Sequence, residues 1–353
     1  MCQNCNNIYQ HKNCFEQYSH KDTRLIFGDY SINSEIIFSI IITVYKRKEY
    51  IHEAINSVIN QKGINILYEI IIICDDPDFD LSEFDIYKCN KHIFLYCNIK
   101  NVGLYNSVNI ASQMSRGRYI SLLHDDDILY PDYLLNVFSF LKKKGNVKCL
   151  IVNRNIIFKN KNISINIFFK LFIYIIFFPV FLIRILFKNY FKIITLKEGL
   201  TYLLSNVYKA PSCGTLFEKD TFIKSGGFNQ DYWPVSDFYY FLRFNKDNPV
   251  FFLKKKLSCY RWLDNLSQNK SIQLSSFEHL AVFFNSIQPL NSINKYYSFF
   301  KNEVLYSKFL MIDKEYRNEI IKNYTQLNKI NYLKWILFKI FNKFFMFIHD
   351  ISV

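Results

Sequence analysis

The acidic run Asp125-Asp126-Asp127 contains the residue types best suited to chemistry. It follows His124 and Tyr119–Leu123, an apolar run with the length of a buried strand. Adjacent carboxylates repel one another. A divalent cation offsets that repulsion, and Mg²⁺ and Mn²⁺ select oxygen ligands. The run therefore predicts either a metal site that also holds a substrate diphosphate, or a solvated acidic loop before the next helix.

Polar side chains also follow two other apolar runs. Asp75 and Asp76 come directly after a run that ends at Cys74, and Tyr45 and Arg47 follow a run that ends at Val44. A tyrosine there could stack on a base, and an arginine could reach a phosphate or a ribose. Alone, Asp-Asp-Pro is ordinary turn chemistry, and an isolated Tyr or Arg is ordinary surface. Together with the acidic run, they suggest a nucleotide with a metal-bound diphosphate.

The elements that would position these residues alternate along residues 36–153. Near-continuous apolar runs predict strands, and apolar residues at intervals of three and four predict helices. The alternation predicts an α/β domain with a mainly parallel sheet, in which ligands bind beyond the carboxyl ends of the strands. We expect strands at 36–44, 68–74, 92–97, 119–123 and 147–153, and helices at 48–61, 104–115 and 131–143.

The rest of the chain is less regular. We expect helices at 196–206, 219–224 and 235–244, strands at 212–217 and 250–257, and mostly helix over 272–350. The predicted organisation is an N-terminal extension (1–35), a catalytic domain (36–267) with an inserted apolar helical segment (163–195), and a helical C-terminal region (268–353).

Composition indicates a globular protein. Half of the 353 residues are apolar and 21% are charged, which excludes an extended disordered chain. The nine cysteines lack the spacing of a disulfide framework, and the polar N-terminus lacks an apolar signal segment, so we expect reduced thiols in the cytosol. Cys2, Cys5, His11 and Cys14 could ligate Zn²⁺, although their spacing matches no common zinc motif, and a loose extension is the alternative.

The net charge of +14 is concentrated in one region. Residues 141–200 hold twelve Lys and Arg and one acid, a net charge of +11. A basic protein is a candidate partner of nucleic acid or of an anionic membrane. The basic residues here lie among Phe and Ile rather than on a solvated stripe, which favours the membrane and argues against nucleic acid.

Two segments favour a membrane surface. The longest uncharged run in 165–187 is Leu171–Ile183, which is shorter than the roughly 20 residues of a spanning helix. We expect interfacial or shallow re-entrant helices bent at Pro179, with a buried helical hairpin as the alternative. Residues 328–348 predict an imperfect basic amphipathic helix, with Lys334 near its apolar face, that lies on a membrane or packs on the catalytic domain.

The order and spacing of several segments resemble the family 2 glycosyltransferases, which have the GT-A fold. The likeness is strong over 37–155 and looser over 196–267. The segments that carry it are FSIIITVYKRKEYIHEAINSVINQ, YEIIIICDD, NVGLYNSVNIASQMSRGRYISLLHDDDIL, GTLFEKDTFIKSGGF, SDFYYFLRF and YRWLDNLS.

The resemblance implies an inverting transfer of a sugar from a UDP- or dTDP-linked donor, with Mn²⁺ or Mg²⁺ as cofactor. Asp237 occupies the position of the catalytic base, and His124 with Asp126 that of the metal-binding Asp-x-Asp motif. Without the family, Asp237 would be read as a helix N-cap. The residues expected to bind the nucleotide sugar are Thr43, Tyr45 (stacked on the base), Arg47, Asp75 (at the base edge), Asn109, Asp125 and Arg261.

The sequence departs from the family pattern at several positions. Thr43 replaces a proline, Val108 an arginine, Ser236 a glutamate, and His124 the first acid of the metal motif. Either His124 contributes a nitrogen, or the working acids are Asp125 and Asp127.

The favoured prediction is a metal-dependent glycosyltransferase of cell-surface polysaccharide synthesis. Its implied acceptor is a glycan linked to polyprenyl diphosphate, and its location the cytoplasmic face of the plasma membrane, peripheral or monotopic. The alternatives are a nucleotidyltransferase, a non-catalytic basic protein that binds membrane or nucleic acid, and an inactive relative.

Overall fold

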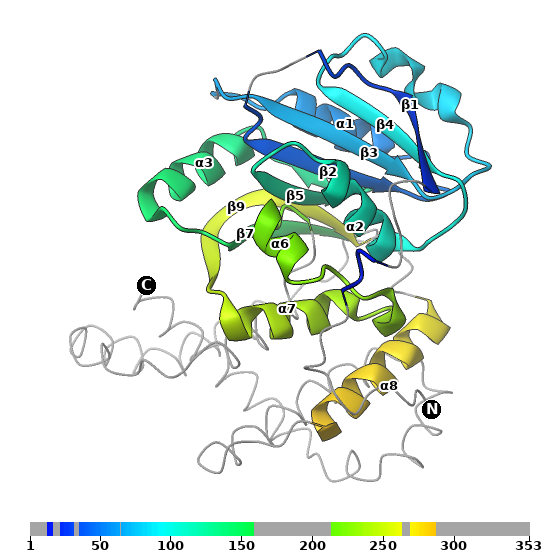
Figure 1. The fold of residues 1–353 in the computed structure, drawn as a ribbon, viewed down its shortest axis with the longest axis vertical. Helices are drawn as coiled ribbons and strands as arrows, with labels where there is room; N and C mark the ends of the chain where they lie inside the picture. The colour runs from blue at the N-terminus through cyan, green and yellow to red at the C-terminus, as the bar shows by residue number, and fades with distance from the viewer. Residues whose placement is uncertain are drawn as a thin grey trace, which may run out of the picture. The chain divides into compact units, whose positions relative to one another are not determined.

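The computed structural model describes residues 13–16, 22–31, 35–63, 65–158, 213–262 and 269–286. The chain divides into two compact units, Met1–Ile157 with Leu203–Gln288, and Phe158–Tyr202 with Pro289–Val353. The first unit contains every described residue except Phe158. It is built on a nine-stranded sheet with the order β1-β4-β3-β2-β5-β8-β7-β9-β6 (Figure 1).

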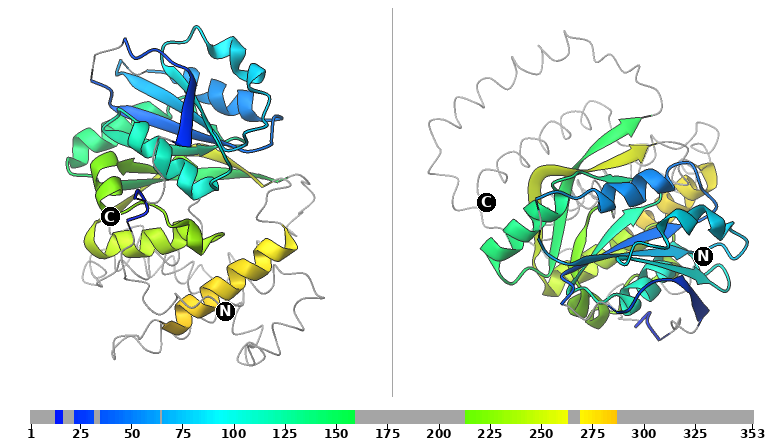
Figure 2. Two further views of the ribbon diagram at one scale, coloured as in Figure 1. Left: turned by 45° about the vertical axis from the view of Figure 1, so that its right-hand side comes forward. Right: turned by 90° about the horizontal axis from the view of Figure 1, so that it is seen from above.

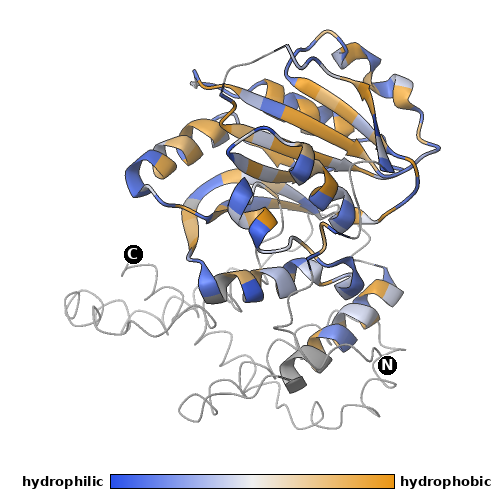
Figure 3. Ribbon diagram, viewed as in Figure 1, coloured by the Kyte–Doolittle hydropathy of each residue, from blue (hydrophilic) through white to orange (hydrophobic). Residues whose placement is uncertain are grey.

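Four parallel strands form one half of the sheet. They are β2 (Phe38–Val44), β3 (Tyr68–Cys74), β4 (Ile93–Asn98) and β5 (Tyr119–His124). All seven residues of β2 are buried, as expected of a central strand covered on both faces. Figure 3 shows these strands as the most apolar part of the ribbon. The predicted α/β class with a mainly parallel sheet is confirmed.

Helices α1 (Ile51–Ile59) and α2 (Leu104–Met114) connect strands of this parallel set, and α3 (Tyr133–Lys144) follows β5. The predicted apolar stripe of α1 is buried at Ile51, Ala54, Ile55 and Val58. The cluster around the even-numbered residues of β2 includes side chains of α1 and α3, and α1 lies behind the sheet and α2 in front of it in Figure 1.

The other half of the sheet is mixed. It contains β6 (Ile128–Leu129), β7 (Cys149–Phe158), β8 (Leu216–Glu218) and β9 (Val250–Trp262). Strand β8 is antiparallel to both β5 and β7, and β6 is antiparallel to β9.

The remaining described helical elements are η3 (Leu81–Tyr87), α6 (Lys219–Lys224), η5 (Gln230–Tyr232), α7 (Ser236–Asp247) and α8 (Lys270–Ser286) (Figure 2).

The sheet includes an edge strand that was not predicted. Strand β1 (Thr23–Phe27) pairs antiparallel with β4, so part of the expected extension 1–35 belongs to the sheet. The sequence gives little indication of β1, because the strand has no fully buried residue and therefore no strong apolar pattern. Near it in the chain, the backbone N–H of Cys14 donates to Gly226 (3.0 Å), and Phe15 packs edge-on against Phe222.

Several predictions fall on residues outside the described ranges. They are the helix 196–206, the insertion 163–195, the amphipathic helix 328–348, and Cys2, Cys5 and His11 of the possible zinc set. Within the described ranges, no helix has both the length and the apolar character needed to cross a membrane.

Candidate active site

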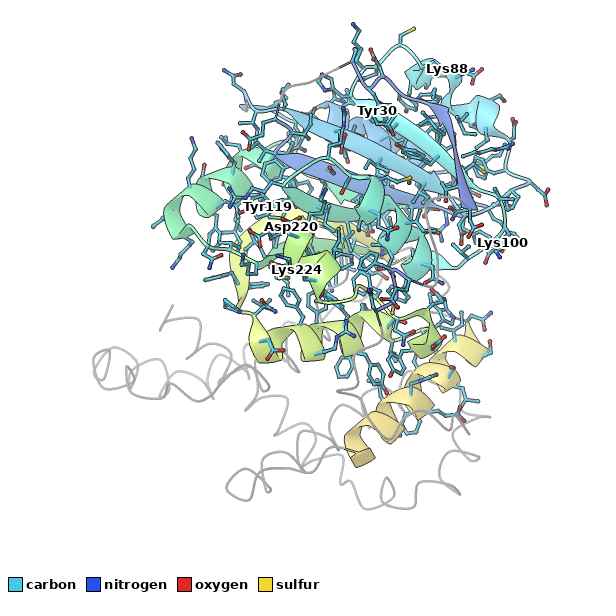
Figure 4. All side chains as sticks on the ribbon, viewed as in Figure 1. Tyr30, Lys88, Lys100, Tyr119, Asp220 and Lys224 are labelled. Carbon is cyan, nitrogen blue, oxygen red and sulfur yellow. The ribbon has the colours of Figure 1, made fainter. Side chains whose placement is uncertain are left out.

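The predicted site residues follow three adjacent strands. In the order β3-β2-β5, Val44 lies beside Cys74 and Thr43 beside His124, so the three strands end at one edge of the sheet. This edge is on the right of the sheet in Figure 1, and α7 begins on the same side. In Figure 4, Lys100, just after β4, marks this edge, and Tyr119, at the start of β5, lies toward the opposite one.

A tight turn follows β2. The N–H of Arg47 donates to the carbonyl of Tyr45 at 2.7 Å, and Lys46 between them has φ +59°, a left-handed conformation that is uncommon for a lysine. The Tyr45 ring is 41% exposed, and the Lys46 Nζ lies 5.1 Å from its centroid. The turn thus leaves an aromatic face accessible and directs Arg47 toward the acidic run.

Arg47 forms an ion pair with the acidic run. Its Nη1 donates to the Asp126 carboxylate and lies 3.6 Å from Oδ1 of Asp125. Burial alone would lower the pKa of Arg47, but the two carboxylates outweigh burial and raise it. Burial raises the pKa of Asp125 to about 7, against the opposing effect of Arg47.

His124 is held in an orientation suited to a neutral ligand. Its Nδ1 lies 3.3 Å from the Thr43 hydroxyl, and burial lowers its pKa, so the ring is neutral at pH 7. Among the described residues, no group of three or more His, Cys, Asp or Glu could hold a metal ion. A metal ion held by His124 and Asp126 would have two protein ligands and would complete its shell with substrate phosphates, as Mg²⁺ commonly does.

Asp127 points into the protein. Its side chain is fully buried, and its Oδ1 accepts a hydrogen bond from the backbone N–H of Arg261 at 3.1 Å. Burial and the charge of Asp126 raise its pKa to about 8. Because Asp127 is fully buried and is hydrogen-bonded to the backbone of Arg261, we favour His124 and Asp126 over Asp125 and Asp127 as candidate ligands.

Arg261 connects three parts of the site. It donates to the Glu53 carboxylate on α1 and to the carbonyl of Asp126 (3.1 Å), and its guanidinium lies 4.6 Å from the Tyr50 ring centroid. Its exposed fraction is 7%. These contacts give Arg261 a positioning role beside its predicted place in nucleotide binding. Sequence reasoning missed Glu53 and Tyr50 as its partners.

The Asp75 carboxylate accepts its hydrogen bonds from neighbouring residues of the protein. Its Oδ1 accepts hydrogen bonds from Asn98 (2.8 Å) and the Val102 N–H (2.9 Å), and its Oδ2 accepts one from the Gly103 N–H (2.8 Å). Burial raises its pKa against these hydrogen bonds. Asp75 thus shapes the loop before α2, and the neighbouring Asp76 is the more exposed of the pair.

Asn109 has a similar positioning role. Its amide donates to the carbonyl of Phe228 (2.7 Å), and its Oδ1 accepts from the Phe228 N–H (3.0 Å). The chain approaches closely because Gly227 has φ +67°, and a Cβ there would lie 2.5 Å from the Asn109 Oδ1. The buried Asn109 fixes the segment that leads into α7 rather than facing an open site.

Asp237 is the second residue of α7 and is half-buried. The N-cap is Val235, so Asp237 is not the simple cap considered from the sequence. Its Oδ1 accepts a hydrogen bond from the Phe238 N–H (2.8 Å). Burial and then the charge of Asp237 raise the pKa of Tyr105, which places that phenol beside the carboxylate.

The family model of glycosyl transferase family 2 matches residues 39–201, slightly less than half of the chain. The chain contains a family 2 glycosyltransferase domain. The matched range includes every site residue described here except Asp237 and Arg261.

Each of three curated relatives matches about a third of the chain. An uncharacterized glycosyltransferase of Haemophilus influenzae is 34% identical over 116 residues, which are 32% of this chain and 35% of the relative. The minor teichoic acid biosynthesis protein GgaB of Bacillus subtilis is 29% identical over 111 residues, 31% of this chain and 12% of GgaB. The match to Methanocaldococcus jannaschii MJ1057 spans 44% of that protein, so none of these three is matched over most of its length.

Solved structures share the fold at low sequence identity. S. aureus TarS 1–349 in complex with UDP-GlcNAc has a TM-score of 0.55 and 14% identity, over 85% of this chain and 77% of that one. Mannosyltransferase PcManGT of Pyrobaculum calidifontis, in complex with GDP-Man and Mn²⁺, has a TM-score of 0.52 and 9% identity, over 91% and 88%. The GT-A fold predicted from the sequence is confirmed.

Proposed function

We propose that this protein is an inverting glycosyltransferase that transfers a sugar from a UDP- or dTDP-linked donor to an acceptor hydroxyl. The observation that carries the proposal is the meeting of an exposed aromatic ring (Tyr45), a guanidinium (Arg47) and His124 with Asp126 at one edge of the sheet. That edge lies within the family 2 glycosyltransferase domain.

In the donor site, Tyr45 stacks on the base, and Arg47 and Asp125 face the phosphates and ribose. Thr43 orients His124 through its hydroxyl. Asp75, Asn109 and Arg261, which are buried, hold the surrounding loops in place, and Asp75 lies at the base edge of the donor.

His124 and Asp126 would hold Mn²⁺ or Mg²⁺. When bound, that ion supplies positive charge that stabilises the departing nucleoside diphosphate. PcManGT, which shares the fold, was solved with Mn²⁺.

Asp237 acts as the general base. Its carboxylate takes the proton of the acceptor hydroxyl as that oxygen attacks the anomeric carbon, and the bond to the diphosphate breaks on the opposite face. The first turn of α7 suits this role because the helix dipole favours an anion there and the Phe238 amide stabilises the carboxylate.

The acceptor is a glycan on polyprenyl diphosphate at the inner face of the plasma membrane. Support comes from the similarity to GgaB, a minor teichoic acid biosynthesis protein, and from the basic and apolar composition of residues 141–200. The bound UDP-GlcNAc of TarS makes UDP-linked sugars the first donors to test.

The test is a transfer assay with labelled UDP- and dTDP-sugars and polyprenyl-diphosphate-linked acceptors. We expect a labelled lipid-linked product and release of UDP or dTDP. Release of a sugar 1-phosphate, with the nucleotidyl group moved to the acceptor, would indicate a nucleotidyltransferase instead. No product and no nucleotide binding across the panel would contradict the proposal.

A further inference from the structure

Arg47 is the positively charged partner of Asp125 and Asp126 in the acidic run. It hydrogen-bonds to Asp126 and lies within ion-pair distance of Asp125, so one guanidinium serves two carboxylates. The Arg47 side chain is 26% exposed, compared with 13% for Asp125 and 6% for Asp126. The Arg47 guanidinium is therefore more accessible than either carboxylate.

The arginine is held by a turn rather than by the hydrophobic core. Lys46 is in a left-handed conformation, and the N–H of Arg47 closes the turn onto Tyr45. The other arginine near the acidic run is different, because Arg261 is 7% exposed and is also fixed by Glu53 and Tyr50. Arg47 can thus change partner without disturbing a buried network.

We propose that Arg47 is an exchangeable counter-ion, which neutralises Asp125 and Asp126 in the donor-free protein and moves onto the donor diphosphate when donor and cation enter. The inference rests on the proposed function, since it takes a nucleoside diphosphate as the incoming ligand. A guanidinium pairs with phosphate oxygens at least as well as with a carboxylate.

The exchange has a thermodynamic consequence. Arg47 and a divalent cation compete for Asp126, so the cation alone binds weakly to the wild-type protein. A diphosphate that draws Arg47 away removes the competitor, and the diphosphate and the cation then strengthen each other's binding by the same factor. Arg47 is thus a donor-binding residue that couples the binding of the diphosphate to that of the cation.

The test compares Mn²⁺ binding to the full chain without nucleotide, measured from the free Mn²⁺ signal in electron paramagnetic resonance. The variants are Arg47→Gln and the matched control Lys48→Gln, since Lys48 is the next basic residue and pairs with Glu83 (2.9 Å) instead. We expect Arg47→Gln to bind Mn²⁺ about tenfold more tightly than wild type, and the control to match wild type. Equal or weaker Mn²⁺ binding by Arg47→Gln would overturn the proposal.

A second measurement guards against a folding defect and separates the two proposals. Arg47→Lys retains the charge, and we expect its Mn²⁺ affinity to lie between those of wild type and Arg47→Gln. If the three Mn²⁺ affinities do not follow this order while wild type binds UDP with Mn²⁺, the counter-ion proposal fails and the glycosyltransferase proposal stands. If Arg47→Gln tightens Mn²⁺ but UDP does not bind to wild type, the proposed donor fails instead.

Discussion

The two ends of the parallel sheet each hold an arginine–carboxylate pair, and the pairs differ in construction. At the amino end, Glu69 on β3 accepts hydrogen bonds from the Ser39 hydroxyl (2.6 Å) and from the backbone N–H (2.7 Å) and Nε (2.8 Å) of Arg116. Glu69 is 1% exposed. At the carboxyl end, the Arg47 pair involves a guanidinium on a turn and a run of adjacent acids.

We interpret the amino-end pair as structural, and we propose that the carboxyl-end pair belongs to the donor site. The Glu69 carboxylate accepts three hydrogen bonds, from a hydroxyl, a backbone N–H and the Arg116 Nε, and Gly117 passes so near that a Cβ would lie 2.5 Å from the Ser39 nitrogen. The carboxylate is therefore enclosed by its own partners, although the Arg116 side chain is 24% exposed. The carboxyl-end pair differs in that adjacent carboxylates, which repel each other, share one arginine, Arg47.

The largest effect is expected at Asp237, the base proposed at the carboxyl end. Asp237→Asn keeps the size of the side chain but removes the proton acceptor, so turnover should fall by about 10² to 10⁴-fold with donor affinity retained. The measurement is steady-state transfer with calorimetric donor binding. Asp247→Asn, at the exposed end of the same helix, is the control and should keep wild-type turnover. Full activity in Asp237→Asn would rule out the assignment.

The next effect concerns the amino-end pair. Glu69→Gln should reduce the free energy of unfolding by about 2 kcal/mol, because the buried Glu69 loses the charge that strengthens its three hydrogen bonds. Denaturant titration measures the change. Glu83→Gln, on the exposed Lys48 pair, should cost less than about 0.5 kcal/mol. Similar values for the two variants would show that the Glu69 pair contributes no more than an exposed ion pair.

The carboxyl-end pair should contribute little to stability. Asp126→Asn is expected to change the free energy of unfolding by less than about 1 kcal/mol, since Arg47 keeps Asp125 and one like-charge repulsion disappears. The same denaturant titration provides the value. A loss near that of Glu69→Gln would mean that Asp126 is structural.

The smallest effect is expected at the turn that carries Arg47. Lys46→Asn should stabilise the protein by about 0.5 kcal/mol, because asparagine tolerates a φ of +59° better than lysine does. Thermal unfolding would detect the shift, and Lys48→Asn, two residues along, is the control. A destabilised Lys46→Asn would show that the lysine side chain itself holds the turn.

Much of the parallel half of the sheet could be predicted from the sequence. The run at 68–74 is apolar enough to be buried on both faces, and the structure has that strand with the same bounds. Strand β1 was missed because an edge strand with exposed Arg24 and Leu25 has no strong hydrophobic pattern.

The site could be located from the sequence, but the partners within it could not. The positions of Tyr45, Asp75 and Asp126 follow from the rule that ligands bind where parallel strands end. The contact between Arg261 and Glu53 joins residues 208 apart in the sequence, and no local pattern signals it. The same holds for Asn109, whose partner Phe228 lies 119 residues away.

The central claim is that the carboxyl end of the sheet binds a nucleoside diphosphate together with a divalent cation. Calorimetric titration of UDP, with and without Mn²⁺, into wild type and Asp126→Ala tests it most directly. We predict that Mn²⁺ strengthens UDP binding to wild type and that Asp126→Ala loses this gain. Equal UDP affinity in both proteins, unchanged by Mn²⁺, would contradict the claim.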